Sequence, residues 1–148
     1  MPKLLLKAIL FACLIFGGHA YADDVGTPEE AKSMAVHAAD FLRQNGPDKA
    51  FPVFNAKTGE FHDRDLYVKV YDNTGKNVSH GVNPALIGKD LLDLKDTDGK
   101  LLIREFVAIQ DRAWVDYKWP DPATKKIRQK TTYVVRVDNY LVGVGAYK

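Results

Sequence analysis

The chain contains a single cysteine, Cys13, which lies in an apolar stretch close to the N-terminus. Beyond that stretch the sequence can therefore form no disulfide and has no thiol for catalysis or metal binding. It also lacks an uninterrupted apolar run of the ~20 residues that a transmembrane helix needs. The formal net charge is only +2, with acidic and basic residues interspersed, so the basic surplus of a nucleic-acid-binding protein is missing.

Local catalytic motifs are absent as well. The sequence contains no G-x-S-x-G, no P-loop and no H-E-x-x-H. Ser79 and His80 are neighbours, but consecutive residues of a strand point to opposite faces and do not form a catalytic pair. An active site assembled only in space would leave no such local pattern. The sequence thus gives no support to an enzyme, and we predict that the protein is not one.

The N-terminus has the order of a secretory signal peptide. Two lysines precede an apolar run over residues 8–16, and the sequence AYA then offers small residues at a cleavage site. We predict that residues 1–22 are a signal peptide cleaved after Ala22, which also removes Cys13. The alternative, an uncleaved membrane anchor, would need a longer apolar run. The product is a single domain over 23–148 without net charge, and its predicted location is the periplasm.

A long helix is predicted within residues 26–46. Thr27 is the expected N-cap, and Glu30 completes a capping box with it. Gly46 ends the pattern. Small apolar residues recur at helical spacing and form a narrow stripe that can lie close to whatever it covers: Ala31, Met34, Ala35, Ala38 and Leu42.

The pattern then becomes that of an antiparallel sheet. Five strands are predicted, over 66–72, 76–81, about 114–119, about 126–137 and about 141–147. The segment 99–113 is predicted as a helix, with Asp98 as its cap. Asp138 and Asn139 form a two-residue hairpin turn between the last two strands. This order predicts one α+β domain, with helices packed on a five-stranded antiparallel sheet.

The segment LKDTDGKLLIRE (94–105) partly matches a calcium-binding loop. Asp96, Asp98 and Glu105 fall on ligand positions, but Leu94 stands where the first acidic ligand belongs. The helix that precedes such a loop is also missing, because proline and glycine interrupt that segment. A loop that caps the following helix is the preferred interpretation, and we predict no metal and no cofactor.

Aromatic and cationic residues recur at alternate positions of the predicted strands, so that several of them share one face of the sheet. Tyrosine and tryptophan need hydrogen-bond partners when they are buried, and a purely apolar core would use phenylalanine and leucine. The alternative is that the tyrosines lie at the sheet edge and that the basic run over 125–130 is a solvated hairpin tip. The predicted ligand-binding residues are Tyr67, Lys69, His80, Tyr117, Trp119, Lys130 and Tyr133.

Three segments in order resemble the single-Cache family of extracellular sensor domains. They are DLYVKVYDNTGKNVSHGVNPALIGKDLLDLKDTDGKLLIREFV, WVDYKWPDPATKKIRQKTTYV and VGVGAYK, which cover most of residues 65–148. The chain departs from the family pattern at Ala113, where glycine is favoured, and at Tyr140, where tryptophan is common. It also has Lys69 where an aromatic residue is common, which places a second cation on the pocket strand.

The resemblance implies a PAS-like sheet with a long N-terminal helix on one side. On the other side it implies a pocket closed by a loop and a short helix, which binds small organic ligands that are often carboxylates. We therefore predict a periplasmic domain that binds a small organic acid, and either passes the signal to a membrane sensor or transporter or buffers the ligand. The alternative is a protein–protein interaction module without a small ligand. A homodimer formed through the N-terminal helix stays open.

Overall fold

The computed structural model describes residues 25–148. The predicted signal peptide, the cleavage site after Ala22 and Cys13 lie outside the described residues. Within the described part, none of the helices combines the length and the apolar character needed to cross a membrane.

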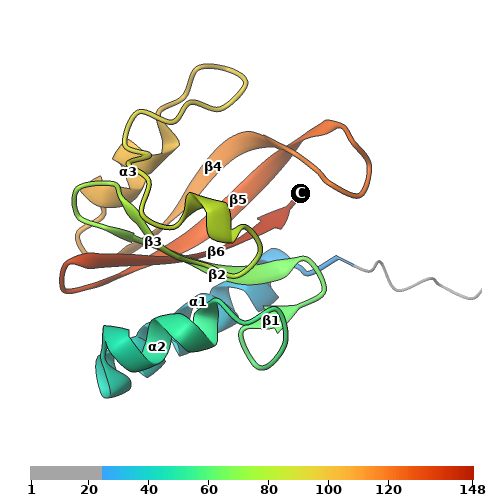
Figure 1. Ribbon diagram of the computed structural model, residues 1–148. Helices are drawn as coiled ribbons and strands as arrows, with labels where there is room; N and C mark the ends of the chain where they lie inside the picture. Colours follow the sequence, from blue (N-terminus) through green and yellow to red (C-terminus); the bar gives the residue numbers. More distant parts are fainter. Residues whose placement is uncertain (1–24) are drawn as a thin grey trace, which may run out of the picture.

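Between residues 25 and 148 the fold consists of three α-helices, one 3-10 turn and six strands (Figure 1). The helices are α1 (Pro28–Asn45), α2 (Pro47–Phe54) and α3 (Leu102–Ala108), and the turn is η1 (Pro84–Leu86). The strands are β1 (His62–Asp63), β2 (Leu66–Asp72), β3 (Asn77–His80), β4 (Arg112–Pro120), β5 (Ile127–Val137) and β6 (Tyr140–Tyr147).

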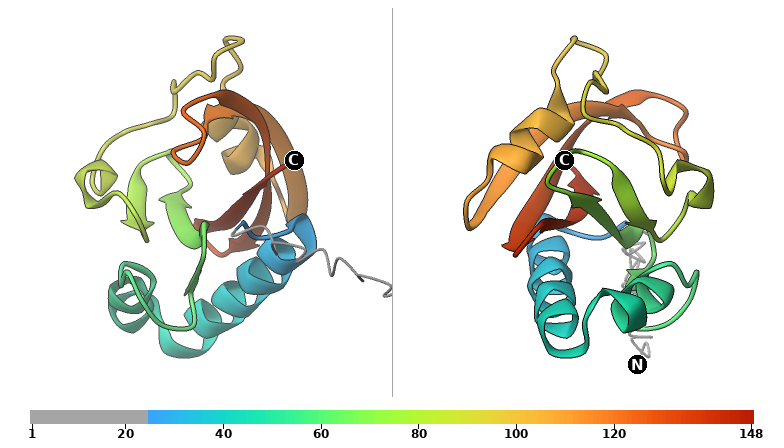
Figure 2. Two further views of the ribbon diagram at one scale, coloured as in Figure 1. Left: turned by 90° about the vertical axis from the view of Figure 1, so that its right-hand side faces the viewer. Right: turned by 60° about the vertical axis from the view of Figure 1, so that its left-hand side comes forward.

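All strand pairs are antiparallel, and the order across the sheet is β1-β2-β6-β5-β4, with β3 also paired to β2. The helices α1 and α2 cover one face of this sheet, whereas α3, η1 and their connecting loop lie on the opposite side (Figure 2). The predicted α+β class is confirmed. The sheet has one strand more than predicted, because the two-residue β1 extends its edge.

The start of α1 follows the predicted capping box. The Thr27 hydroxyl accepts a hydrogen bond from the Glu30 backbone N–H at 3.2 Å, and the Glu30 carboxylate accepts one from the Thr27 N–H at 2.8 Å. The helix ends at Gly46, which has a φ of 76°. The alanine stripe of α1 is fully buried on the sheet, so the helix axis lies close to the strands beneath it.

The second long helix is shorter than predicted. Instead of spanning 99–113, α3 ends at Ala108, and β4 already begins at Arg112. The reason is tertiary: β5 is long enough to pair with the residues after α3, with Arg112 opposite Val135, and strand pairing overrides the local helical pattern. Asp98 does not cap α3 either, because its carboxylate pairs with Lys118 at 2.8 Å.

Candidate ligand-binding site

A cavity of about 230 Å³ lies on the face of the sheet opposite α1. Its floor comes from β2, β4 and β5, and its cover from the loop after β3 and the start of α3. Six of the seven residues predicted to bind a ligand line this cavity: Tyr67, Lys69, His80, Tyr117, Trp119 and Lys130. The strands thus bring together residues that are up to several tens of positions apart in the sequence.

Tyr133 is the exception, and the prediction that it faces the pocket is wrong. It pairs with Trp114 across β4 and β5 and packs in the core beneath α1. There the Lys32 ammonium lies 5.3 Å from the centroid of its ring. Tyr133 follows Lys130 by three positions, and an odd separation along a strand places two side chains on opposite faces.

Lys69 is buried on the cavity floor, with 6% of its surface exposed. Its ammonium donates a hydrogen bond to the Tyr117 hydroxyl at 2.8 Å, and that hydroxyl lies 2.8 Å from the hydroxyl of Thr132. This chain links β2, β4 and β5 through side chains alone. Burial disfavours the charged amine and lowers the pKa of Lys69 to about 7.

Lys130 approaches the same cavity from β5 and is 4% exposed. Its ammonium lies over two rings, 4.8 Å from the centroid of Tyr147 and 5.3 Å from that of Tyr67. Such cation–π contacts stabilise a cation that has lost its water. Burial is the main cause that lowers the pKa of Lys130 to about 8, and the nearby charge of Lys69 contributes in the same direction.

In the part of the chain that the structure describes, neither lysine forms an ion pair with a carboxylate. Within residues 25–148 no carboxylate oxygen lies within 4.0 Å of the ammonium nitrogen of Lys69 or Lys130. A buried lysine normally needs such a partner, since removing an ammonium group from water is costly. Two of them in one cavity create a site that is electrostatically suited to an anion.

His80 is held at the point where the chain leaves β3 for the cavity cover. Its Nδ1 accepts hydrogen bonds from the backbone N–H groups of Val82, at 3.3 Å, and Asn83, at 2.9 Å. Burial and the two lysine charges lower the pKa of His80 to about 4. The imidazole is therefore neutral at pH 7 with its proton on Nε2, which leaves one N–H donor beyond those contacts.

Two glycines of β6, which the sequence reasoning missed, make room for Thr132, and one of them, Gly145, also makes room for Lys130. A Cβ at Gly145 would lie 2.7 Å from Cε of Lys130 and 2.6 Å from the Thr132 hydroxyl oxygen. One at Gly143 would lie 3.0 Å from Thr132 and 3.8 Å from Cε of Lys69. The alternation V-G-V-G in a strand was a usable signal, because glycine inside a strand often marks a close approach.

The sequence profile of the family described as Single Cache domain 2 matches residues 19–148. The chain belongs to this family. The resemblance stated from the sequence is thereby confirmed, and the cavity described above lies within a Cache domain.

Two curated relatives of this Cache domain are a sensor histidine kinase and a chemotaxis protein. The sensor histidine kinase MctS of Rhizobium johnstonii is 36% identical over 88 residues, which are 57% of this chain and 19% of the kinase. The methyl-accepting chemotaxis protein McpP of Pseudomonas putida is 33% identical over 91 residues, 58% of this chain and 17% of that protein. The match thus spans less than a fifth of the length of either relative.

Solved structures share the fold of the Cache domain. A methyl-accepting chemotaxis protein from Vibrio parahaemolyticus superposes with a TM-score of 0.65 at 26% identity, covering 80% of this chain and 86% of that one. A Cache chemosensory domain described for its recognition of carboxylic acids superposes with a TM-score of 0.59 at 23% identity, over the same shares of the two chains. The second likeness bears on the fold alone.

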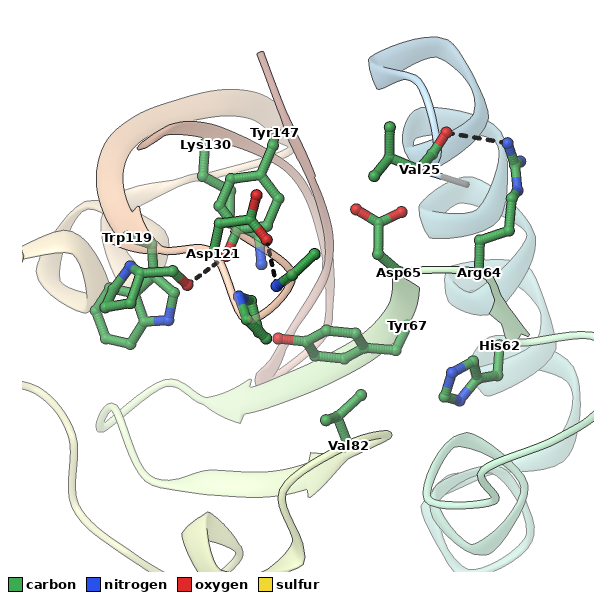
Figure 3. Close-up of a pocket in the computed structure, with 13 residues that line it drawn as sticks. Val25, His62, Arg64, Asp65, Tyr67, Val82, Trp119, Asp121, Lys130 and Tyr147 are labelled. Atoms are coloured by element: carbon green, nitrogen blue, oxygen red, sulfur yellow. Dashed lines mark hydrogen bonds between the residues drawn. The ribbon is translucent and has the colours of Figure 1, made fainter. Parts of the chain in front are cut away.

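Figure 3 shows a second cavity of the Cache domain, of about 360 Å³, which shares part of its lining with the first. Five residues line both cavities and mark the boundary between them: Tyr67, Val82, Trp119, Pro122 and Lys130. We call the first cavity the inner chamber and the second the outer chamber. The outer chamber also takes in Asp65, from the turn before β2, and Asp121, from the hairpin loop between β4 and β5.

The segment that resembles a calcium loop has a structural role in this Cache domain. One oxygen of the Asp96 carboxylate accepts hydrogen bonds from the N–H groups of Asp98 and Lys100, both at 2.9 Å. The other oxygen accepts one from the Lys118 N–H at 3.0 Å and so ties the loop to β4. In the part of the chain that the structure describes, no group of three or more acidic, histidine or cysteine side chains is placed to hold a metal ion.

Proposed function

We propose that this Cache domain binds a small organic carboxylate in the periplasm and reports it to, or buffers it for, a membrane sensor or transporter. The observation that carries the proposal is the pair of buried lysines, Lys69 and Lys130, that line one cavity without a carboxylate partner within residues 25–148. A bound carboxylate would supply the missing negative charge to both.

Four residues of the inner chamber have a role in this proposal. Lys130 and Lys69 neutralise the ligand carboxylate, and the neutral His80 offers its Nε2–H. Trp119 forms a wall for the apolar part of the ligand. The volume of about 230 Å³ lies below the ~300 Å³ at which pockets for drug-sized molecules begin, so the part of the ligand held there is small.

The kinship with sensor domains supports the proposal at the level of class. The curated relatives are a sensor histidine kinase and a chemotaxis protein, and a solved neighbour with the same fold recognises carboxylic acids. A shared fold does not by itself transfer a ligand. The choice of a carboxylate for this chain therefore depends on the two lysines.

The test is isothermal titration calorimetry of the mature domain with acetate, propionate, pyruvate and lactate, with each compound's uncharged amide as a control. We expect at least one carboxylate to bind and its amide not to bind. The variant Lys130→Met should bind that carboxylate about ten-fold more weakly or worse, because a charge-assisted hydrogen bond contributes ~1.5–3 kcal/mol.

The matched control is Lys126→Met, which removes an exposed lysine from the same hairpin and should leave the affinity unchanged. Thermal unfolding of both variants checks that each is folded. If no organic acid binds to the wild-type domain, the proposal fails and the interaction module without a small ligand takes its place. If Lys130→Met binds as tightly as wild type, the assignment of Lys130 fails.

A further inference from the structure

The inner and outer chambers share part of their lining, but carboxylate groups line only the outer one. The inner chamber is lined by Lys69 and Lys130 and by no carboxylate group. The outer chamber is lined by Asp65 and Asp121, with Lys130 at the boundary and Arg64 at the rim. A ligand that spans the boundary would therefore meet positive charge at one end and negative charge at the other.

The two aspartates of the outer chamber are not equivalent. Asp121 is 3% exposed and already neutralised, because its carboxylate pairs with Arg128 at 2.8 Å and also accepts from the Ala123 N–H and the Thr124 hydroxyl. It holds the hairpin loop in shape. The Asp121 carboxylate is thus already paired within the protein and does not need a ligand to neutralise it.

Asp65 forms no such ion pair within residues 25–148, although its charge acts on Lys130, whose pKa it raises. Its carboxylate accepts one hydrogen bond from the backbone N–H of Gly26, and within residues 25–148 no lysine, arginine or histidine nitrogen lies within 4.0 Å of it. Its neighbour Arg64 is directed elsewhere, toward Glu30, Asp63 and the Val25 carbonyl oxygen. Figure 3 shows the Asp65 carboxylate facing the chamber while Arg64 extends to the far side.

Aromatic rings complete the outer chamber. Tyr67, Tyr147 and Trp119 contribute to its lining. Tyr67 and Tyr147 already hold the Lys130 ammonium over their faces, so the boundary between the chambers is a surface that tolerates a cation. A carboxylate beside aromatic rings is a common setting for a bound ammonium group, since both attract a cation.

We propose that the outer chamber is a subsite for an ammonium group paired with Asp65, and that the ligand is a small amino carboxylate. This inference rests on the proposed function, because the carboxylate end occupies the inner chamber at Lys69 and Lys130. A simple carboxylate would leave Asp65 without a partner. A dicarboxylate would bring its second negative charge toward Asp65 and be repelled.

Because the lysines and Asp65 line different chambers, the position of the amine in the ligand restricts the class of amino carboxylate further. In an α-amino acid the ammonium lies two bonds from the carboxylate carbon and would stay among the lysines of the inner chamber, where it is repelled. An amine several bonds away can cross the boundary at Lys130 and reach the outer chamber. The inference therefore favours amino acids whose amine is at the far end of the carbon chain.

The experiment compares each amino acid with the carboxylate that lacks its amine. Calorimetry of the mature domain would use β-alanine against propionate, γ-aminobutyrate against butyrate, and δ-aminovalerate against valerate. We expect at least one amino acid of the series to bind about ten-fold more tightly than its partner, the gain of one charge-assisted hydrogen bond. In Asp65→Asn that ratio should fall to about one, whereas the butyrate and valerate affinities should not decrease.

The asparagine variant keeps an oxygen that can accept a hydrogen bond from the Gly26 N–H. The ratio of the two affinities is measured within one variant, so a loss of folding would appear as lost binding of both compounds. Asp63→Asn is the matched control, because Asp63 is exposed and pairs with Arg64. It should keep the wild-type ratio.

The outcomes separate the two proposals. If simple carboxylates bind through Lys130 but no amino acid exceeds its partner, or Asp65→Asn keeps the wild-type ratio, the ammonium subsite is wrong and the carboxylate site stands. If neither series binds, the proposed function fails, and the subsite inference fails with it.

Discussion

The face of the sheet beneath α1 and the face that floors the inner chamber are made of alternate residues of the same strands. In β2, Val68 and Val70 pack beneath the helices, whereas Lys69 between them lies in the cavity. In β6, Val142 and Val144 belong to the helix-side core, while Gly143 and Gly145 leave space on the other side. One set of positions therefore provides stability, and the other provides a site that carries uncompensated charge.

The inner chamber therefore depends on the apolar face that the same strands pack beneath α1. Two desolvated lysines that form no ion pair within residues 25–148 reduce stability. The tightly packed apolar face must offset that cost. Substitutions on the two faces should consequently separate stability from binding, and the following predictions test that separation.

The largest effect is expected on the helix side. Phe54 is fully buried and contacts the rings of Phe41, Phe51 and Phe61. Phe54→Ala should lower the free energy of unfolding by about 3–5 kcal/mol, the usual cost of a large cavity in a core. Urea unfolding gives this value, and the folded fraction should retain the wild-type ligand affinity. A variant that unfolds normally but binds poorly would contradict the separation of the faces.

On the cavity side, the destabilisation caused by the two buried lysines should depend on pH. The pKa values of Lys69 and Lys130 in the folded domain, about 7 and about 8, lie below the usual value of 10.5. Between about pH 7 and about pH 9 the unfolded chain therefore binds more protons, and the stability of the ligand-free domain should rise with pH. Urea unfolding at several pH values measures this slope.

The double variant Lys69→Met and Lys130→Met is the control for that slope. It should be at least as stable as wild type at pH 7 and should lose most of the rise. The opposite trend, with wild type losing stability as the pH rises through this window, would mean that both amines are compensated by groups outside the cavity.

A smaller effect is expected from filling the gap beside Lys130. In Gly145→Ala the new methyl group would lie too close to Cε of Lys130 and to Thr132, so the amine must move. Overpacking of this kind costs ~1–3 kcal/mol of stability, and carboxylate affinity should fall, though less than in Lys130→Met. Gly143→Ala is the milder comparison, because its methyl group would meet Lys69 only at an ordinary contact distance. Equal affinities for wild type and Gly145→Ala would show that Lys130 is not positioned by β6.

The smallest effect is expected for Tyr133→Phe. Because this ring packs beneath α1, removal of its hydroxyl should leave carboxylate affinity unchanged. Tyr117→Phe is the comparison on the cavity side, since it removes the oxygen that joins Lys69 to Thr132 and should weaken binding. If calorimetry shows the two variants to be equally impaired, the assignment of faces in β5 is wrong.

The capping box of α1, the hairpin turn at 138–139 and the alternation in β2 could all be predicted, because each has a local pattern with a physical cause. The face of Tyr133 was harder to predict. Residues 130–135 of β5 are all buried, so no polar–apolar alternation distinguishes the two sides. The sequence separation was nevertheless informative, because two strand residues three positions apart, such as Lys130 and Tyr133, cannot lie on the same face.

The outer chamber left no comparable pattern in the sequence. Asp65 lies in a turn, and Asp121 begins a hairpin loop, and aspartate is common in both settings for local reasons. Only the folded chain brings them next to Tyr67 and Lys130. The end of the helix over 99–113 was mispredicted for a related reason, because the competing partner, β5, lies far along the chain.

The hydrogen-bonded chain from Lys69 through Tyr117 to Thr132 has one more consequence. A lysine ammonium has three donors, and Lys69 uses one of them on the Tyr117 hydroxyl. In the proposed complex the carboxylate takes another donor while the Tyr117 contact persists, so the amine is held in place before the ligand binds. The rotamer freedom of a long side chain is then lost during folding instead of during association, and a very small ligand can bind without the entropic penalty of ordering its own receptor.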